Sequence, residues 1–137
     1  MKVFVYGTVM PGGKYHDYIC HGAVSSFQEA KVKGKLYDLN VGYPGLLLGG
    51  KTWVRGYLLS FENEDVLKKL DRLEGFDETN IQAANEYNRI RVSIFDLTER
   101  FMAQGWVYFM NDDQLSRFDY LEIESGEWKN KKANRKS

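Results

Sequence analysis

The segment from Gln28 to Leu39, QEAKVKGKLYDL, alternates apolar and polar residues, and this period of two is typical of a β-strand with one buried face. The chain then turns within Gly42-Tyr43-Pro44-Gly45 and continues into three leucines at positions 46–48. Gly49-Gly50 follows, a dipeptide that predicts a hairpin turn, and Thr52 to Phe61 alternates again. These residues therefore predict a meander of antiparallel strands.

Three more strands are predicted on either side of this meander. Lys2 to Tyr6 is a short apolar run that ends at a Gly-Thr turn, while Asn88 to Leu97 and Phe101 to Met110 form two further strands. A short helix is expected from Lys14 to His21, after the Pro-Gly-Gly break at 11–13. Glycines within the strands, at positions 34, 56 and 105, favour strong coiling. The predicted fold class is α+β, with a mixed, six-stranded, barrel-like sheet and one main helix.

The main helix is expected from Asn63 to Glu74. Asn63 can cap its first turn, and Gly75 can end it in the left-handed conformation. We expect Asp71 and Arg72 to face solvent. The apolar stripe of the helix consists of Val66, Leu67, Leu70 and Leu73.

Glu74 lies four residues after Leu70 and seven after Leu67, which places it on the buried stripe of this helix. Burial and the negative C-terminal end of the helix would both raise its pKa. A carboxyl group of that kind is suited to accept a proton near neutral pH. The competing interpretation is that Glu74 sits in a frayed last turn and swings into water.

Length and charge limit the classes of function. A chain of 137 residues, 43% of them apolar, is expected to form a single domain, here residues 1–128. The 19 basic and 19 acidic side chains cancel, but the last ten residues hold five basic and no acidic ones. We interpret residues 129–137 as a disordered, solubilising basic tail rather than an RNA contact. The remaining acidic body argues against a nucleic-acid partner.

The same composition argues against a membrane or secreted protein. No uncharged stretch is longer than eleven residues, whereas a spanning helix needs roughly 20. No cleavage site follows the first apolar run, which indicates an unprocessed, cytoplasmic protein. Cys20 is the only cysteine, so an internal disulfide is excluded.

The loop Tyr6-Gly7-Thr8-Val9 follows a strand that we expect to be buried, so its successive backbone N–H groups can point into a cavity and bind an anion. A phosphate-binding loop is a competing interpretation, because strand, glycine loop and helix come in the matching order. Its spacing does not fit, since Tyr15 stands where a magnesium-binding Ser or Thr is required and Pro11 removes a donor. Gly7 by itself would also be explained as a turn residue.

Two other constellations carry less weight. His16 and Cys20, four residues apart on the expected short helix, would suit a thiol nucleophile and its base, although a single cysteine is commonly a small buried apolar residue. With only two histidines, a His-rich metal site is excluded. Glu74 paired with Asp77 or Glu78 would suit glycosidase chemistry, but residues 77–80 are typical of a polar loop.

Several of these motifs occur together and in one order. They are Tyr6-Gly7-Thr8-Val9, Gly42-Tyr43-Pro44-Gly45, Leu70 to Phe76 (LDRLEGF), Tyr87 to Val92 (YNRIRV) and Ile123 to Trp128 (IESGEW). From Val3 to Trp128 the chain resembles the gamma-glutamylcyclotransferase-like family. The resemblance implies a six-stranded barrel in which Tyr6, Gly7, Thr8 and Val9 bind substrate and Glu74 is the catalytic acid/base. The family usually has Leu at position 9 and often Asn at position 15, where this chain has Val and Tyr.

The implied substrate is a small gamma-glutamyl amine or peptide, whose α-amine attacks its own γ-carbonyl, closes a 5-oxoproline ring and expels an amine. Such a reaction needs a base, an acid and donors for the oxyanion, but no protein nucleophile and no cofactor. Glu74 can serve as both base and acid. The amides from Gly7 to Val9 can hold either the oxyanion or the substrate's α-carboxylate.

Tyr87, Arg89 and Tyr108 are further candidates for substrate binding. For Arg89 the competing interpretation is a structural ion pair, and for the two tyrosines it is a place in the core. A different class of function also fits the pattern: a non-catalytic binding module of the same fold that recognises a small carboxylate ligand or a protein partner. Exposed aromatic side chains are compatible with a homodimer.

Overall fold

The computed structural model describes residues 1–17 and 24–129. Within these ranges the strands are β1 (Lys2–Val5), β2 (Val24–Asp38), β3 (Pro44–Phe61), β4 (Asn88–Phe95), β5 (Phe101–Phe109) and β6 (Leu121–Ile123). The helices are α2 (Asp65–Glu74), the 3-10 turn η1 (Gln82–Ala84) and α3 (Asp112–Leu115). Of the short helix predicted at 14–21, residues 16 and 17 are helical, and the rest, including Cys20, lies outside the described residues. The predicted tail, apart from Lys129, also lies outside them.

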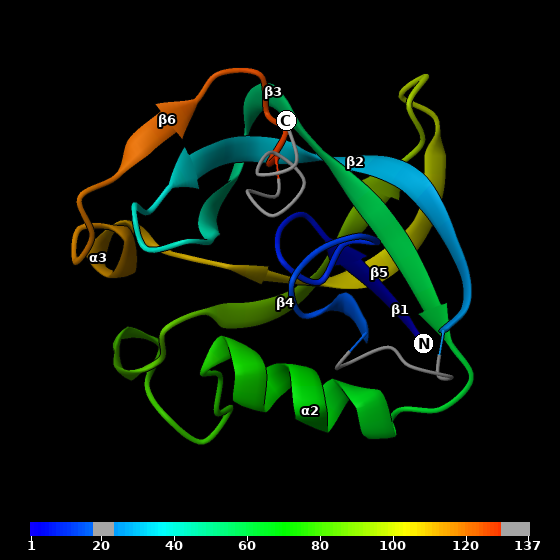
Figure 1. Cartoon of the computed structure of the whole chain (residues 1–137), viewed down its shortest axis with the longest axis horizontal. Helices are drawn as coiled ribbons and strands as arrows, with labels where there is room; N and C mark the ends of the chain where they lie inside the picture. The colour runs from blue at the N-terminus through cyan, green and yellow to red at the C-terminus, as the bar shows by residue number, and fades with distance from the viewer. Residues whose placement is uncertain (18–23, 130–137) are drawn as a thin grey trace.

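The strands form one curved sheet that closes on itself (Figure 1). Their order is β3-β1-β5-β4-β2-β6, and an additional pairing between β2 and β3 completes the barrel. β1 runs parallel to β5, whereas the other neighbours are antiparallel. The prediction of a mixed, six-stranded, barrel-like sheet with one main helix is therefore confirmed.

The long β2–β3 pair differs from the prediction at one point. Gly49-Gly50 is not a hairpin turn, because residues 49–52 form an insertion within β3 and the strand pairs with β2 on both sides of it. The two glycines have φ values of 98° and 81°, a conformation that a bulge can require as well as a turn. The turn that joins β2 to β3 lies earlier, at residues 39–43, where Gly42 has a φ of 97°.

The main helix α2 largely follows the prediction. The helix begins at Asp65, two residues later than predicted, and Glu64 rather than Asn63 occupies the N-cap position. The side chain of Asn63 accepts a hydrogen bond from the N–H of Asp65 at 3.0 Å, and Gly75 ends the helix with a φ of 67°, as predicted.

Arg72 is exposed as expected, but Asp71 is partly buried and faces β5. The expectation for Asp71 was wrong because its carboxylate has partners from distant strands, Tyr108 on β5 and Arg89 on β4. No helix of the described residues is long and apolar enough to span a membrane.

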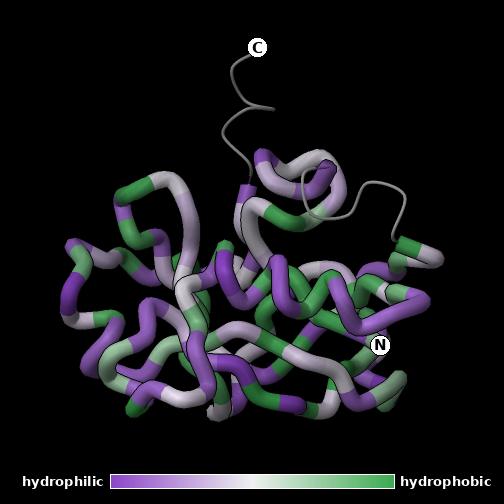
Figure 2. The backbone as a smooth tube through the Cα atoms, turned by 90° about the horizontal axis from the view of Figure 1, so that it is seen from below, coloured by the Kyte–Doolittle hydropathy of each residue, from purple (hydrophilic) through white to green (hydrophobic). Residues whose placement is uncertain are grey.

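Apolar side chains from five strands and α2 meet inside the barrel. Figure 2 shows the alternation of hydrophobic and hydrophilic segments along the chain that allows one face of each strand to be buried. The fully buried side chains include Phe4 on β1, Leu36 on β2, Leu59 on β3, Ile94 on β4 and Leu70 on α2. This core holds the end of β1 and the end of α2 close together.

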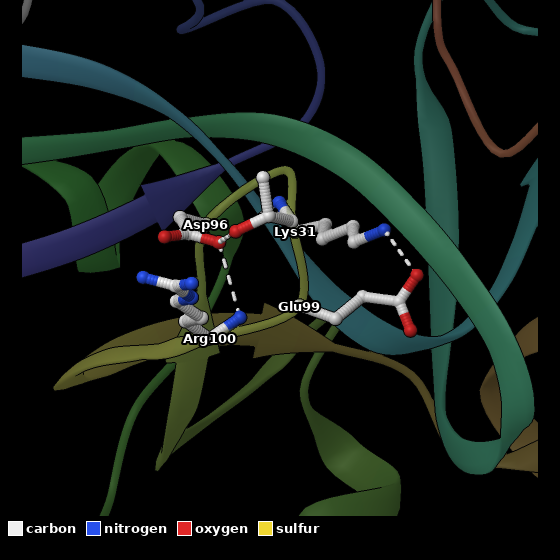
Figure 3. A network of polar contacts seen from close by, with 5 residues as sticks. Lys31, Asp96, Glu99 and Arg100 are labelled. Carbon is white, nitrogen blue, oxygen red and sulfur yellow. Dashed lines mark hydrogen bonds and ion pairs between the residues drawn. The ribbon is translucent and has the colours of Figure 1, made fainter.

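The turn between β4 and β5 is tied to β2 by the buried Lys31 (Figure 3). The Lys31 ammonium lies 3.1 Å from a carboxylate oxygen of Glu99 and 4.6 Å from the centre of the Trp53 ring. Asp96 accepts hydrogen bonds from the backbone N–H groups of Thr98 and Arg100 in the same turn. These contacts stabilise the wall of the barrel.

Candidate active site

A pocket lies where β1 ends and the chain turns away from the barrel. Its inner recess of about 30 Å³ has the space of about two water molecules. An outer chamber of about 160 Å³ shares four lining residues with the recess. The recess is lined by Phe4, Val5, Tyr6, Gly7, Thr8, Val9, Tyr43, Pro44, Leu70, Glu74, Tyr87 and Tyr108. The structure thus brings the loop from Tyr6 to Val9 and Glu74 around one pocket.

The backbone of this loop presents donors to its surroundings. Its carbonyl oxygens are occupied: that of Gly7 accepts from Met10 N–H at 3.1 Å, and that of Thr8 from Tyr15 N–H at 2.8 Å. The Val9 carbonyl accepts a hydrogen bond from the His16 ring nitrogen Nδ1 at 2.8 Å. Among the described residues, none accepts a hydrogen bond from the N–H groups of residues 7, 8 and 9. Three successive amides without an acceptor among these residues are available to bind an anion.

Gly7 fits its place because of Pro44. A Cβ added at Gly7 would lie 2.9 Å from two ring carbons of Pro44, closer than real Cβ contacts come. The glycine therefore allows the loop to lie against Pro44, the first residue of β3, which also lines the recess.

Glu74 is the last residue of α2, and its side chain is partly buried. Burial, and to a smaller extent the charge of Glu86, raises the pKa of Glu74 to about 8. The sequence indicated the effect of burial, but it gave no signal for Glu86. A carboxyl group whose pKa lies near the working pH can both take up and release a proton.

Three tyrosines frame the recess with their rings and direct their hydroxyl groups to protein partners. The hydroxyl of Tyr6 donates to the carbonyl oxygen of Tyr108 at 2.6 Å, and that of Tyr87 donates to the carbonyl oxygen of Pro44. The hydroxyl of Tyr108 donates to the carboxylate of Asp71 at 2.6 Å. Burial raises the pKa of all three hydroxyl groups above their usual value, so they stay neutral. Their first role in the structure is therefore to hold the pocket walls.

Arg89 pairs with Tyr108 across β4 and β5, and the two side chains contact the same carboxylate oxygen of Asp71. Arg89 does not belong to the lining of either part of the pocket. Its Nε lies 2.9 Å from the carboxylate of Asp71, and its guanidinium lies 4.3 Å from the ring centre of Trp106 and 5.0 Å from that of Phe76. This environment favours the structural ion pair over contact with a ligand.

Replacing Arg89 with Met is expected to lower the free energy of unfolding by about 2 kcal/mol, because the partly buried Asp71 loses its cation. The KM is expected to change by less than about twofold, since Arg89 lies outside the pocket. Urea unfolding and steady-state kinetics measure the two effects, with Arg91→Met, an exposed position on the same strand, as control. A large rise in KM at unchanged stability would instead place Arg89 against the substrate.

Four lining residues of the outer chamber were not predicted as site residues: Tyr15, Tyr43, Leu73 and Glu86. The hydroxyl of Tyr43 donates a 2.6 Å hydrogen bond to Glu86, and both side chains line the chamber together with Glu74. Tyr43 belongs to the Gly-Tyr-Pro-Gly motif, which was a usable signal. Glu86 follows an irregular segment, and no periodic pattern in the sequence predicts the position of this residue.

A buried polar network fixes the segment that carries Glu86 and Tyr87. Gln114 of α3 donates hydrogen bonds to the carbonyl oxygens of Gln82 at 3.0 Å and Asn85 at 2.8 Å, and accepts one from Asn88 at 2.8 Å. Gln114 and Asn88 are each only 1% exposed. Buried and mutually satisfied amides of this kind hold a single backbone conformation.

No group of three or more His, Cys, Asp or Glu side chains within residues 1–17 and 24–129 is arranged to hold a metal ion. Two kinds of group line the pocket: the Glu74 carboxyl, which can transfer a proton, and the N–H groups of the loop, which can donate hydrogen bonds.

Sequence comparisons point to one family. The family model described as "Gamma-glutamyl cyclotransferase, AIG2-like" matches residues 3–130. A "Gamma-L-glutamyl-butirosin B gamma-glutamyl cyclotransferase" from Niallia circulans is 33% identical over 128 residues, which cover 93% of this chain and 75% of the relative. A "Putative gamma-glutamylcyclotransferase" from Vibrio cholerae is 34% identical over 128 residues, covering 92% of this chain and 93% of the relative.

Solved structures share the fold. YkqA from Bacillus subtilis matches 98% of this chain with a TM-score of 0.66 and 22% identity, and the match spans 42% of YkqA. PH0828 from Pyrococcus horikoshii matches 99% of this chain and 96% of its own, with a TM-score of 0.63 and 16% identity. An aig2-like protein from Mus musculus matches 93% of this chain and 87% of its own, with a TM-score of 0.62 and 19% identity.

Proposed function

Because the chain belongs to the gamma-glutamyl cyclotransferase, AIG2-like family, we propose that it cleaves a small gamma-glutamyl amine or peptide by cyclising the glutamyl group to 5-oxoproline. The chain is an enzyme of the cyclotransferase type. The name of the Niallia circulans relative specifies gamma-L-glutamyl-butirosin B. For this chain we propose only that the substrate contains a gamma-glutamyl group.

The observation that carries the proposal is the shared pocket of Glu74 and the amides of residues 7–9. The recess is too small for a whole glutamyl group, so it receives oxygen atoms, from either the γ-carbonyl or the α-carboxylate. The rest of the substrate then occupies the outer chamber, which Glu74 also lines. Both reacting nitrogens, the α-amine and the scissile amide nitrogen, would lie next to Glu74.

In the reaction, the α-nitrogen forms a bond to the γ-carbon, and the bond between that carbon and the leaving nitrogen breaks. Between the α-ammonium group and the lactam, the α-nitrogen loses two protons. Glu74 takes one of them and delivers it to the leaving nitrogen, so Glu74 ends as it began, and the second passes to the departing amine, which leaves as an ammonium ion. The amides of the loop stabilise the negative charge that develops on oxygen. Holding amine and carbonyl in contact supplies a further part of the rate by removing the entropy of their encounter.

The raised pKa of Glu74 suits this cycle. Near pH 7 the empty site holds the carboxyl mostly protonated, because its pKa is about 8. A bound α-ammonium group brings a positive charge next to it, which favours the carboxylate. Binding of the substrate would thus favour the Glu74 carboxylate, which is the form that acts as the base.

The direct test is to incubate the protein with gamma-glutamyl amines and dipeptides and to follow 5-oxoproline by chromatography. We expect stoichiometric release of 5-oxoproline and the free amine. Release of glutamate instead would indicate hydrolysis, and binding without any product would favour a non-catalytic module of the same fold.

The pH profile of kcat/KM gives a second expectation, since kcat/KM reports groups of the free enzyme. Its acidic limb is expected to have a midpoint near pH 8, because Glu74 must be unprotonated when it meets the α-ammonium group. Glu86→Gln removes a negative charge next to Glu74 and is expected to move the midpoint down by roughly one pH unit. The pKa values of the tyrosines near Glu74 are raised, so these hydroxyl groups stay neutral in this pH range. They therefore do not change the midpoint of the acidic limb.

Tyr43→Phe is the matched control, since it removes the hydrogen bond to Glu86 but leaves the Glu86 charge in place. Its limb is expected to stay near pH 8. A profile that Glu86→Gln and Tyr43→Phe shift equally would show that the hydrogen bond, and not the charge, acts on Glu74.

A further inference from the structure

The outer chamber of the pocket has an acidic wall. Among residues 1–17 and 24–129, those that line it are Thr8, Tyr15, Tyr43, Leu73, Glu74, Glu86 and Tyr87, and none of these is Lys, Arg or His. Glu74 is shared with the inner recess, whereas Glu86 lines only the chamber. A group that passes through the chamber toward solvent therefore passes a carboxylate.

Glu86 is held firmly in this position. Its backbone N–H donates to the carbonyl oxygen of Gly75 at 3.1 Å, and its Oε1 accepts the 2.6 Å hydrogen bond from Tyr43. Among the described residues, none donates a hydrogen bond to the other oxygen, Oε2, although a carboxylate can accept several. Tyr43 therefore orients Glu86 and leaves it with acceptor capacity for a ligand.

In the part of the chain that the structure describes, the cations of the neighbouring elements have other partners or are exposed. Arg89 is paired with Asp71, and Arg72 is exposed on the solvent side of α2. The ammonium group of Lys14 is exposed and lies 5.2 Å from the ring centre of Tyr15. No salt bridge joins any of the described cations to Glu86.

We propose that Glu86 is a specificity residue that favours gamma-glutamyl substrates whose leaving amine carries a second, positively charged group. The inference rests on the proposed function, because it takes the glutamyl group to be bound between the loop amides and Glu74. From that position the leaving amine extends along the part of the chamber that Glu86 and Tyr15 line. A positively charged group there contacts the Glu86 carboxylate, which Tyr43 already orients. The attraction between these two charges is stronger in a partly desolvated site than in water.

The test compares two substrates of the same shape. One is the gamma-glutamyl amide of (2-aminoethyl)trimethylammonium, whose charge does not depend on pH, and the other is the gamma-glutamyl amide of 3,3-dimethylbutylamine, its neutral isostere. We expect kcat/KM of the wild-type enzyme to be about tenfold higher for the cationic substrate at low salt, and this ratio to fall toward one at high salt. Measuring both substrates at one pH cancels any effect of Glu86 on the protonation of Glu74.

Glu86→Gln is expected to reduce the ratio to about one. The control Glu78→Gln removes an exposed carboxylate outside the chamber and is expected to keep the wild-type ratio. If both substrates are turned over in a Glu74-dependent way but with equal kcat/KM, or with a ratio that survives Glu86→Gln, the inference is wrong while the proposed function stands. If neither substrate gives 5-oxoproline, the premise fails and the inference with it.

Discussion

Glu74→Gln is expected to lower kcat by about a thousandfold, within the range of general acid–base contributions. Gln keeps the size of the side chain and its place on the last turn of α2, but it cannot take the proton from the α-ammonium group or deliver one to the leaving amine. Substrate affinity is expected to change far less, since the amides of residues 7–9 are untouched. The rate of 5-oxoproline formation under saturating substrate measures the effect.

Glu78→Gln is the matched control, because it makes the same chemical change at an exposed position four residues further on. Its kcat is expected to equal that of the wild-type enzyme. Circular dichroism of each variant separates a chemical effect from a folding defect. An undiminished kcat in a folded Glu74→Gln variant would remove Glu74 from the chemistry.

The second large effect is expected in the stability of the protein as a function of pH. The pKa of Glu74 is raised from an ordinary value of 4.5 to about 8 in the folded state, so the folded state binds this proton more tightly than the unfolded chain. The stabilisation that this proton provides is complete below pH 4.5 and is lost as the pH rises toward 8. Between these limits the loss amounts to up to about 4 kcal/mol.

Glu74→Gln removes this dependence, because its amide does not titrate. The free energy of unfolding of the variant, minus that of the wild-type protein, is expected to increase steadily between pH 5 and pH 9. Urea unfolding at several pH values measures it, and groups that titrate equally in both proteins cancel in the difference. A flat difference would mean that the carboxyl is solvated and has an ordinary pKa. The catalytic residue would thus reduce stability under the conditions in which it works.

Local patterns in the sequence were sufficient for the elements that position the site. The period of two in β2 and β4, the glycine that ends α2 and the spacing from Leu67 and Leu70 to Glu74 are all properties of neighbouring residues. They predicted the barrel-like sheet and the helix, and they placed Glu74 on the inward face. The structure brings Glu74 to the loop at the end of β1, which lies far away in the sequence.

The differences have a common physical cause, which is contact between distant segments. Gly49-Gly50 has the residues of a hairpin turn, but pairing with β2 on both sides keeps it within one strand. Asp71 is polar and was expected to be exposed, but Tyr108 and Arg89 bind its carboxylate. Glu86 raises the pKa of Glu74 although it lies twelve positions further along the chain. Partners of this kind become apparent only when the chain is folded.

A crystal structure of the Glu74→Gln variant with an uncleaved gamma-glutamyl amine is the most direct test of the shared pocket. The expected result places one oxygen of the glutamyl group within hydrogen-bond distance of the N–H groups of residues 7–9, with the α-nitrogen and the scissile nitrogen both beside Gln at position 74. A ligand bound elsewhere, or bound here with its α-nitrogen turned away from position 74, would contradict the assignment of this pocket as the site of cyclisation.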